Sequence, residues 1–180
     1  MVKNLLLVDF DNTLYLNETV KQATQQLKDI KPTADNIRLQ PLYTYTHKNI
    51  TKIIFTGRPN DNEQQMIEFI DEHSNKTFEL FYFMDWSIVP KDAIREIVYI
   101  HYWSYKWAII TELRNLHKKQ IIVIEDDPAI CGMCARFEIP NIFIDLYNKY
   151  YRIYRNGFYK KYHIDNLNPM FEYINFIVAD

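Results

Sequence analysis

The chain has 180 residues, 48% of them hydrophobic and 24% charged, which suffices for one sizeable core and predicts a single globular domain over 1–180. Its apolar run at residues 5–8 is too short for a signal peptide or for the about 20 residues that span a bilayer, so we expect no membrane partner. Two cysteines cannot form a disulfide framework, which favours a reducing, cytoplasmic setting. Abundant Ile, Asn, Lys and Tyr are typical of an AT-rich genome, such as that of a virus or phage.

The formal charge of −2 conceals an uneven distribution of charge. Residues 146–163 contain no acidic side chain, so all 23 Asp and Glu residues lie elsewhere. The basic residues of this strip are Lys149, Arg152, Arg155, Lys160 and Lys161. A basic strip on an acidic body can attract a polyanion.

The first half of the chain alternates predicted strands and helices. Apolar runs predict strands over 5–8, 52–56 and 80–84. Between the first two strands, residues 20–30 have the spacing of an amphipathic helix that ends before a proline. Residues 61–73 predict a second helix, with Asn60 or Asp61 as its N-cap.

The second half continues the alternation after an ambiguous segment. Residues 86–105 contain a proline and an aromatic cluster and favour no single element. A helix is predicted over 106–118, followed by a strand over 121–124. A helix over 129–137 and a strand over 141–144 complete the pattern.

Strands that alternate with helices favour one fold class. Such a pattern is typical of a parallel sheet with right-handed crossovers and helices on both faces. We therefore predict an α/β fold, a Rossmann-like three-layer sandwich around a central parallel sheet.

Two aspartates follow the first strand directly. In a parallel α/β sheet, ligands bind at the carboxyl ends of the strands, so Asp9 and Asp11 are expected beside a crevice. Two carboxylates this close repel each other unless a cation neutralises them, which indicates Mg²⁺. The alternative is an ordinary turn, because Asp-Asn-Thr is also common turn and N-cap chemistry.

Four stretches, taken in order, resemble the motifs of the haloacid dehalogenase (HAD) superfamily. They are Asp9-Phe10-Asp11-Asn12-Thr13-Leu14, Phe55-Thr56-Gly57-Arg58-Pro59, Lys106 and Ile124-Glu125-Asp126-Asp127. The resemblance covers about 4–146 and implies that the first strand is central, between the second and fourth. The layout is similar to small-cap phosphatases related to RNA-repair and polynucleotide 3′-phosphatase domains. It implies a minimal cap at about 14–50 and a basic-aromatic extension at 146–180.

The resemblance assigns roles to the carboxylates. Asp9 would be the nucleophile and a magnesium ligand. Asp11 would be the general acid and base, with its backbone carbonyl on the metal. Asp126 would be the third ligand, with Asp127 or Glu125 holding metal-bound water from further out. The alternative for the last group is an acidic turn that a proline ends.

Positive and polar groups are expected at the phosphoryl group. The Thr56 hydroxyl and the Gly57 amide are placed to hydrogen-bond a phosphoryl oxygen, whereas Arg58 either grips a substrate phosphate or stays in solvent. Lys106, at the start of its predicted helix, matches the lysine motif and would neutralise Asp9 and the phosphoryl group. Lys91 is the rival lysine, one element earlier.

Three aromatic residues and two cysteines stay open to more than one interpretation. Trp103, Tyr105 and Trp107 flank the lysine and are either core or a stacking wall for a base. Cys131 and Cys134 have the spacing of half a zinc site with no second pair to complete it, and small residues on a helix packed against a sheet explain them better.

The expected activity is Mg²⁺-dependent hydrolysis of a phosphomonoester through an aspartyl-phosphate, with a polynucleotide terminal phosphate as one substrate. The alternatives are a phosphatase of small metabolites, nucleotides or phosphoproteins, and a non-catalytic nucleic-acid-binding or scaffold protein on the same frame. The basic strip interleaves cations with tyrosines, which suits single-stranded nucleic acid. It also suits an edge element with its rings on the core and its charges in water.

Overall fold

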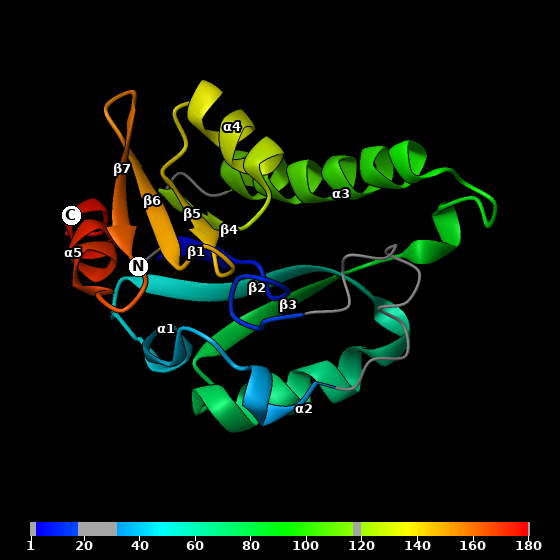
Figure 1. Ribbon diagram of the computed structural model, residues 1–180, viewed down its shortest axis with the longest axis horizontal. Helices are drawn as coiled ribbons and strands as arrows, with labels where there is room; N and C mark the ends of the chain where they lie inside the picture. Colours follow the sequence, from blue (N-terminus) through cyan, green and yellow to red (C-terminus); the bar gives the residue numbers. More distant parts are fainter. Residues whose placement is uncertain (1–2, 18–31, 117–119, 180) are drawn as a thin grey trace.

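One sheet of seven strands forms the centre of the described molecule (Figure 1). The computed structural model describes residues 3–17, 32–116 and 120–179. The strands are β1 Asn4–Val8, β2 Ile50–Pro59, β3 Phe78–Met84, β4 Ile121–Glu125, β5 Asn141–Asp145, β6 Tyr150–Arg155 and β7 Phe158–His163. The predicted strands thus all exist, and β2 extends past its predicted end to Pro59.

The strand order is β3-β2-β1-β4-β5-β6-β7. Strands β1 to β5 pair in parallel, which confirms the predicted parallel sheet. Strand β1 lies between β2 and β4, as expected. Strands β6 and β7 continue the sheet as an antiparallel hairpin at one edge.

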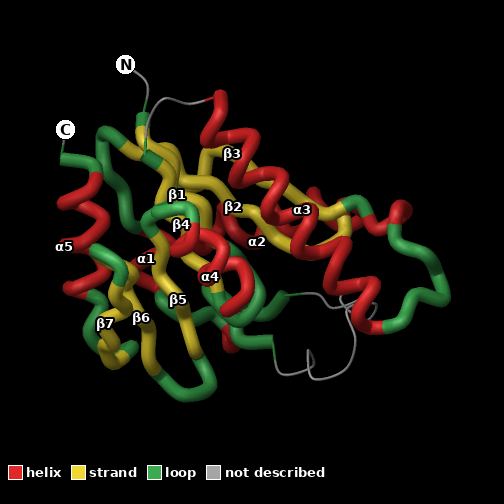
Figure 2. The backbone as a smooth tube through the Cα atoms, turned by 90° about the horizontal axis from the view of Figure 1, so that it is seen from above, coloured by secondary structure: helices red, strands yellow, loops and turns green. Residues whose placement is uncertain are grey.

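Helices cover both faces of this sheet (Figures 1 and 2). The α-helices are α1 Gln40–Thr44, α2 Glu63–Ser74, α3 Arg95–Leu116, α4 Pro128–Arg136 and α5 Asn168–Ile177, with short 3₁₀ turns η3 Ala34–Asn36, η4 Asn60–Asn62 and η5 Trp86–Ile88. Side chains of α3 and α4 pack on one face, and those of α1, α2 and α5 pack on the other. The result is a Rossmann-like three-layer α/β sandwich. Among the described helices, none is long and apolar enough to cross a membrane.

Strand β1 shows how the sequence builds both cores. Successive side chains of a strand point to opposite faces. Leu6 and Val8 therefore join the core under α2 and α5, whereas Leu5 and Leu7 join the core under α3 and α4. All five residues of β1 are buried, as expected for a central strand covered on both sides.

Helix α3 begins eleven positions before the predicted start, so the expectation that Lys106 opens a helix is wrong. Lys106 instead lies in the middle of α3. The ambiguous segment 86–105 holds η5 and the first half of α3. Its helical periodicity is masked because apolar side chains such as Ile97 and Ile100 are exposed, on the side opposite buried Val98.

The other predicted helices and the expected cap differ from the structure in smaller ways or lie outside the described residues. The helix expected at 20–30 lies outside the described residues. Helix α2 begins at Glu63 after a 3₁₀ turn, so neither predicted N-cap residue caps it. From the segment expected as a cap, Leu42 and Tyr43 of α1 are fully buried in the core of the domain.

Strands β6 and β7 support the interpretation of the basic strip as an edge element. The Tyr151 ring is fully buried and stacks on Tyr162. The Tyr159 hydroxyl donates to Cys131 O and Asn141 Oδ1, which ties the hairpin to α4 and β5. The strip's four strand cations are exposed, and they are Arg152, Arg155, Lys160 and Lys161.

Lys52 is a buried amine that anchors α1 to β2. Its Nζ donates to Leu42 O at 2.8 Å, Tyr43 O at 2.7 Å and Thr77 Oγ1 at 2.8 Å. These acceptors are neutral, and burial lowers the pKa of Lys52 to about 7. Both carbonyl acceptors belong to the last turn of α1, where carbonyls have no partner within the helix.

This burial predicts a pH-dependent stability. Because the unfolded amine has a pKa near 10.5, the unfolded chain binds more protons between pH 7 and 9, and raising the pH favours the folded form. The free energy of unfolding of the wild type should therefore rise by about 2 kcal/mol relative to Lys52→Met over this range. Urea denaturation at both pH values measures the difference, since all other titrating groups are shared. Lys48→Met, at an exposed lysine, should show no such change.

Candidate functional site

A cavity of about 300 Å³ lies at the carboxyl ends of the central strands and beside α3. Strand β1 leads into Asp9, β2 contributes Thr56, and β4 leads into Asp126. The lining residues are Asp9, Asp11, Asn12, Thr56, Gly57, Tyr99, Tyr102, Trp103, Asp126, Asp127 and Pro128. This is the edge of a parallel sheet where ligands bind.

Asp9 is buried at this edge with both carboxylate oxygens engaged. Oδ1 accepts from Lys106 Nζ at 2.6 Å, and Oδ2 accepts from Thr13 Oγ1 at 3.0 Å. The backbone N–H of Asp9 continues the β1–β4 pairing by donating to Ile124 O. Asp9 is therefore held at both its backbone and its side chain.

Lys106 reaches this carboxylate from the centre of α3. It is fully buried, and its Nζ also donates to Phe55 O at 2.6 Å and Glu125 Oε2 at 2.9 Å. Burial alone would lower the pKa of Lys106, but the charges of Asp9 and Glu125 raise it. The rival, Lys91, is exposed and does not line the cavity.

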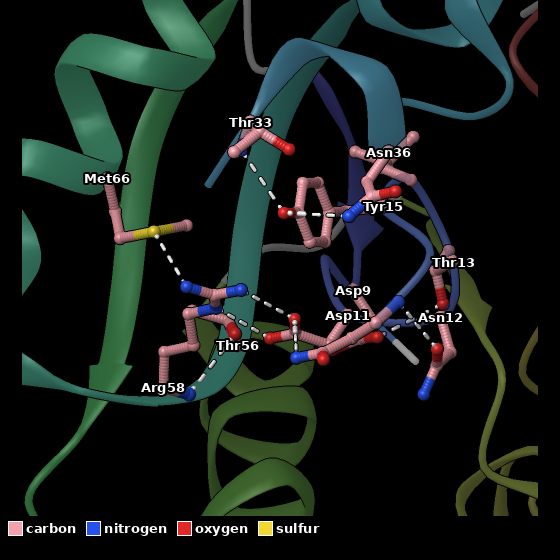
Figure 3. Close-up of polar contacts among 12 residues, drawn as sticks. Asp9, Asp11, Asn12, Thr13, Tyr15, Thr33, Asn36, Thr56, Arg58 and Met66 are labelled. Carbon is pink, nitrogen blue, oxygen red and sulfur yellow. Dashed lines mark hydrogen bonds and ion pairs between the residues drawn. The ribbon is translucent and has the colours of Figure 1, made fainter. Parts of the chain in front are cut away.

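Asp11 points away from Asp9. The chain turns at Asn12, which has a φ of 58°. Arg58 then grips Asp11 with two bonds of 2.8 Å, from Nε to Oδ2 and from Nη2 to Oδ1 (Figure 3). Asn17 Nδ2 donates to the same carboxylate at 3.1 Å.

The environment of Arg58 corrects one expectation. Its side chain is buried, so the interpretation that it stays in solvent is wrong. Its Nη1 contacts Met66 Sδ (Figure 3). Its guanidinium lies over the rings of Phe10 and Tyr15. In this structure, its Nε and Nη2 groups are turned toward Asp11.

Three carboxylates gather where a metal could bind. Ligand atoms of Asp9, Glu125 and Asp126 all lie within 4.8 Å of one another. The side chains of Asp11 and Asp127 are not in this group. Glu125, which was expected further from the metal, is its third carboxylate. Buried Glu125 is fixed by accepting from the backbone N–H groups of Asp126 and Asp127 at its Oε1.

The electrostatics of this cluster favour a divalent cation. Burial, followed by the charge of Glu125, raises the pKa of Asp9 to about 8. Burial and the neighbouring Asp9 likewise raise the pKa of Asp126. If all three carboxylates are ionised beside the one ammonium, the net charge is −2, so a divalent cation is needed to keep them charged, and hard oxygen ligands suit Mg²⁺. The residues therefore fit the expected metal.

Thr56 and Gly57 line the cavity from within β2. The Thr56 hydroxyl accepts from the Arg58 N–H at 3.2 Å, and the Gly57 carbonyl accepts from Trp86 Nε1 at 2.8 Å. A Cβ at Gly57 would lie 2.5 Å from Tyr102 Cε2. Glycine is needed here because the Tyr102 ring packs directly on the strand.

Asp127 stabilises the packing of α4 and α3 beside the cavity. Its Oδ1 accepts from the Ala129 N–H, which makes it the N-cap of α4. Its Oδ2 accepts from Trp103 Nε1 at 2.8 Å. Asp127 thus joins α4 to α3 at the rim of the cavity.

The structure shows where the aromatic residues and cysteines with more than one interpretation lie. Trp103, Tyr105 and Trp107 all pack against the core under α3 and α4, and of the three Trp103 also lines the cavity. Cys131 and Cys134 are free and buried on α4, and neither belongs to the group of candidate metal ligands, as the packing explanation expects.

Several residues of the site were not predicted from the sequence, among them Thr13 and Tyr99. Thr13 was regarded as turn chemistry, although its position four residues after Asp9 brings its hydroxyl back to that carboxylate. Tyr99 lies in the ambiguous segment, and its part in the cavity wall depends on the unrecognised start of α3.

Comparisons with known proteins do not assign a family. No protein-family model matches the chain. No curated protein matches it at a significant level.

Asp126 and Asp127 should respond oppositely to substitution. Mg²⁺ at about ten times its dissociation constant should raise the wild-type melting temperature by about 3–5 °C, because only the folded state gathers the carboxylates. Asp126→Ala should lose this shift. Asp127→Ala should keep it but melt lower without metal, since losing an N-cap costs about 1 kcal/mol.

Differential scanning calorimetry with and without Mg²⁺ measures both effects. Equal shifts in all three proteins would place the metal elsewhere and contradict the assignment.

Proposed function

We propose that the chain is a Mg²⁺-dependent phosphomonoester hydrolase of the HAD type that acts through an aspartyl-phosphate. The observation that carries this proposal is the placement of Lys106 between Asp9 and Glu125, with Asp126 beside them and an open cavity in front. The order of the four motifs along the chain supports the same assignment, as does the central position of β1. The small-cap subgroup is part of the proposal.

Asp9 is the nucleophile. Its carboxylate oxygen attacks the phosphorus, the bond from phosphorus to the leaving oxygen breaks, and an acyl phosphate forms on Asp9. Lys106 and Thr13 hold this carboxylate in one orientation, so little side-chain freedom is lost on reaction. Water then attacks the phosphorus and regenerates Asp9.

Asp11 transfers the protons. It protonates the leaving oxygen in the first step and takes a proton from the attacking water in the second. While Asp11 is paired with Arg58, both of its carboxylate oxygens accept hydrogen bonds from the guanidinium. The pair must therefore open before Asp11 can act as an acid, and opening also frees Arg58 for a phosphoryl oxygen.

Asp9, Asp126 and Glu125 would hold the metal, the last either directly or through water. When bound, Mg²⁺ supplies positive charge that offsets the charge of the phosphoryl oxygens. The Thr56 hydroxyl and the Gly57 N–H border the same cavity as donors for those oxygens. Lys106 neutralises part of the charge of Asp9 throughout.

Asp9→Asn should reduce phosphate release to less than about a thousandth of the wild-type rate while leaving the fold intact, because amides do not form the acyl phosphate. A panel of nucleotides, sugar phosphates, phosphopeptides and end-phosphorylated oligonucleotides, assayed with Mg²⁺, measures the loss. Asp92→Asn, an exposed aspartate outside the cavity, is the matched control and should retain activity. Substantial turnover by Asp9→Asn would exclude the covalent mechanism. A folded wild type inactive on the whole panel would favour the non-catalytic alternative.

A polynucleotide end is the more specific candidate substrate. A second cavity of about 330 Å³ shares Pro128 with the first and is lined by Tyr150, Arg152 and Tyr159 of the hairpin. Arg152 and Lys161 both lie over the Tyr150 ring. A chain whose terminal phosphate is at Asp9 could therefore pass Pro128 and meet cations and rings.

Replacing the four exposed hairpin cations together by Gln should lower kcat/KM for a phosphorylated oligonucleotide far more than for a mononucleotide. Each lost phosphate contact should also reduce the slope of log K against log salt by about 0.7. The four changes are Arg152→Gln, Arg155→Gln, Lys160→Gln and Lys161→Gln.

A control variant should carry Gln at Lys48, Lys76 and Arg114, which are exposed on other elements and should not affect this preference. Equal losses on both substrates would leave the hairpin a purely structural role and favour small phosphomonoesters.

A further inference from the structure

One wall of the cavity is aromatic, and all its rings come from α3. Tyr99, Tyr102 and Trp103 line the cavity that also holds Asp9. Tyr99 and Trp103 are four residues apart, which places them on one face of the helix. Their ring centroids are 5.5 Å apart and their planes lie 30° apart. The proposed hydrolysis assigns no step to these rings.

The rings of this wall are held in place by their neighbours. Trp103 Nε1 donates to Asp127 Oδ2 at 2.8 Å, which fixes the indole relative to α4. The Tyr102 ring packs on Gly57, with Lys106 Nζ at 5.4 Å from its centroid. Arg95 donates to the Tyr99 hydroxyl at 3.3 Å. Rigid aromatic side chains lose little conformational freedom when a ligand binds.

Helix geometry sets the distance between this wall and the reacting group. With a rise of 1.5 Å per residue, Trp103 lies about 4.5 Å along α3 from Lys106, and Tyr99 lies about 10 Å along it. A phosphoryl group at Asp9 and Lys106 would therefore have its leaving group directed along the rings. A planar base joined to the phosphate through one sugar spans a comparable distance.

We propose that Tyr99, Tyr102 and Trp103 form a stacking wall that selects phosphomonoesters whose leaving group carries a nucleobase. This inference rests on the proposed phosphatase function and adds a substrate class, nucleotides or the terminal nucleotide of a strand. Bases stack on aromatic side chains largely independently of sequence, so the wall selects for a base without reading which one. Trp103, the ring of the wall nearest to Lys106 along α3, is the main specificity residue.

Adenosine 3′- and 5′-monophosphate and ribose 5-phosphate provide the test. All three release a sugar hydroxyl once the leaving oxygen is protonated, so a difference in kcat/KM reports the base. The wild type should prefer a nucleotide by about 5- to 100-fold, the range expected for one stacked base. Trp103→Leu should remove most of that preference through KM, whereas Trp103→Phe, which keeps a ring, should retain much of it.

Trp107→Leu is the matched control, because Trp107 lies on the same helix but packs on Phe137 outside the cavity. It should leave the preference unchanged. Melting temperatures show whether each variant folds, and Tyr99→Leu replaces Trp103→Leu if the latter does not.

Binding separates this inference from the proposed activity. Calorimetry of the adenosine monophosphates with Asp9→Asn, with and without Trp103→Leu, measures stacking without turnover. Weaker binding in the double variant supports the wall even if no phosphate ester is hydrolysed. Hydrolysis with equal kcat/KM for nucleotide and ribose phosphate, unchanged by Trp103→Leu, would overturn the wall and leave the phosphatase standing.

Discussion

The site depends on one buried ammonium group. Lys106 extends from the middle of α3 to the ends of β1, β2 and β4, where it bonds Asp9, Phe55 O and Glu125. A buried lysine is costly without partners, and buried carboxylates are costly without a cation. Each therefore requires the other, and α3 can pack on the sheet only in the register that brings them together. The position of the aromatic wall follows from the same register, because its rings belong to the same helix.

Much of this fold could be predicted because the strand signals are local. An apolar run such as β1, ended by a polar turn, needs no distant information, and the alternation with helices determines the parallel order. Helix α3 could not be delimited because its first half carries apolar side chains on exposed and buried faces alike. Since Ile97 and Ile100 do not mark a core face, periodicity recognised only the half that covers the sheet.

The sequence predicted many of the residues that form the site but not which of them pair with one another. Proximity of Asp9 and Asp126 follows from strand ends meeting at one edge, whereas Lys106 reaches them from the middle of α3. The pairing of Asp11 with Arg58 does not, because it depends on the turn at Asn12. Glu125 was placed further from the metal site than the structure places it, because a side chain at the last position of a strand can face either the core or the crevice.

In the proposed mechanism, the ion pair of Asp11 and Arg58 links the protonation of Asp11 to the binding of the phosphoryl group by Arg58. In the pair the two charges cancel, so Arg58 offers little attraction to an entering phosphate. If Asp11 gains the proton that it later donates, Arg58 loses its counter-charge and can turn to the phosphoryl oxygens. Protonation of Asp11 and binding of the phosphoryl oxygens by Arg58 then occur together. The rings of Phe10 and Tyr15 lie beneath the guanidinium and favour its positive charge in the paired position, so Arg58 stays charged while it is bonded to Asp11.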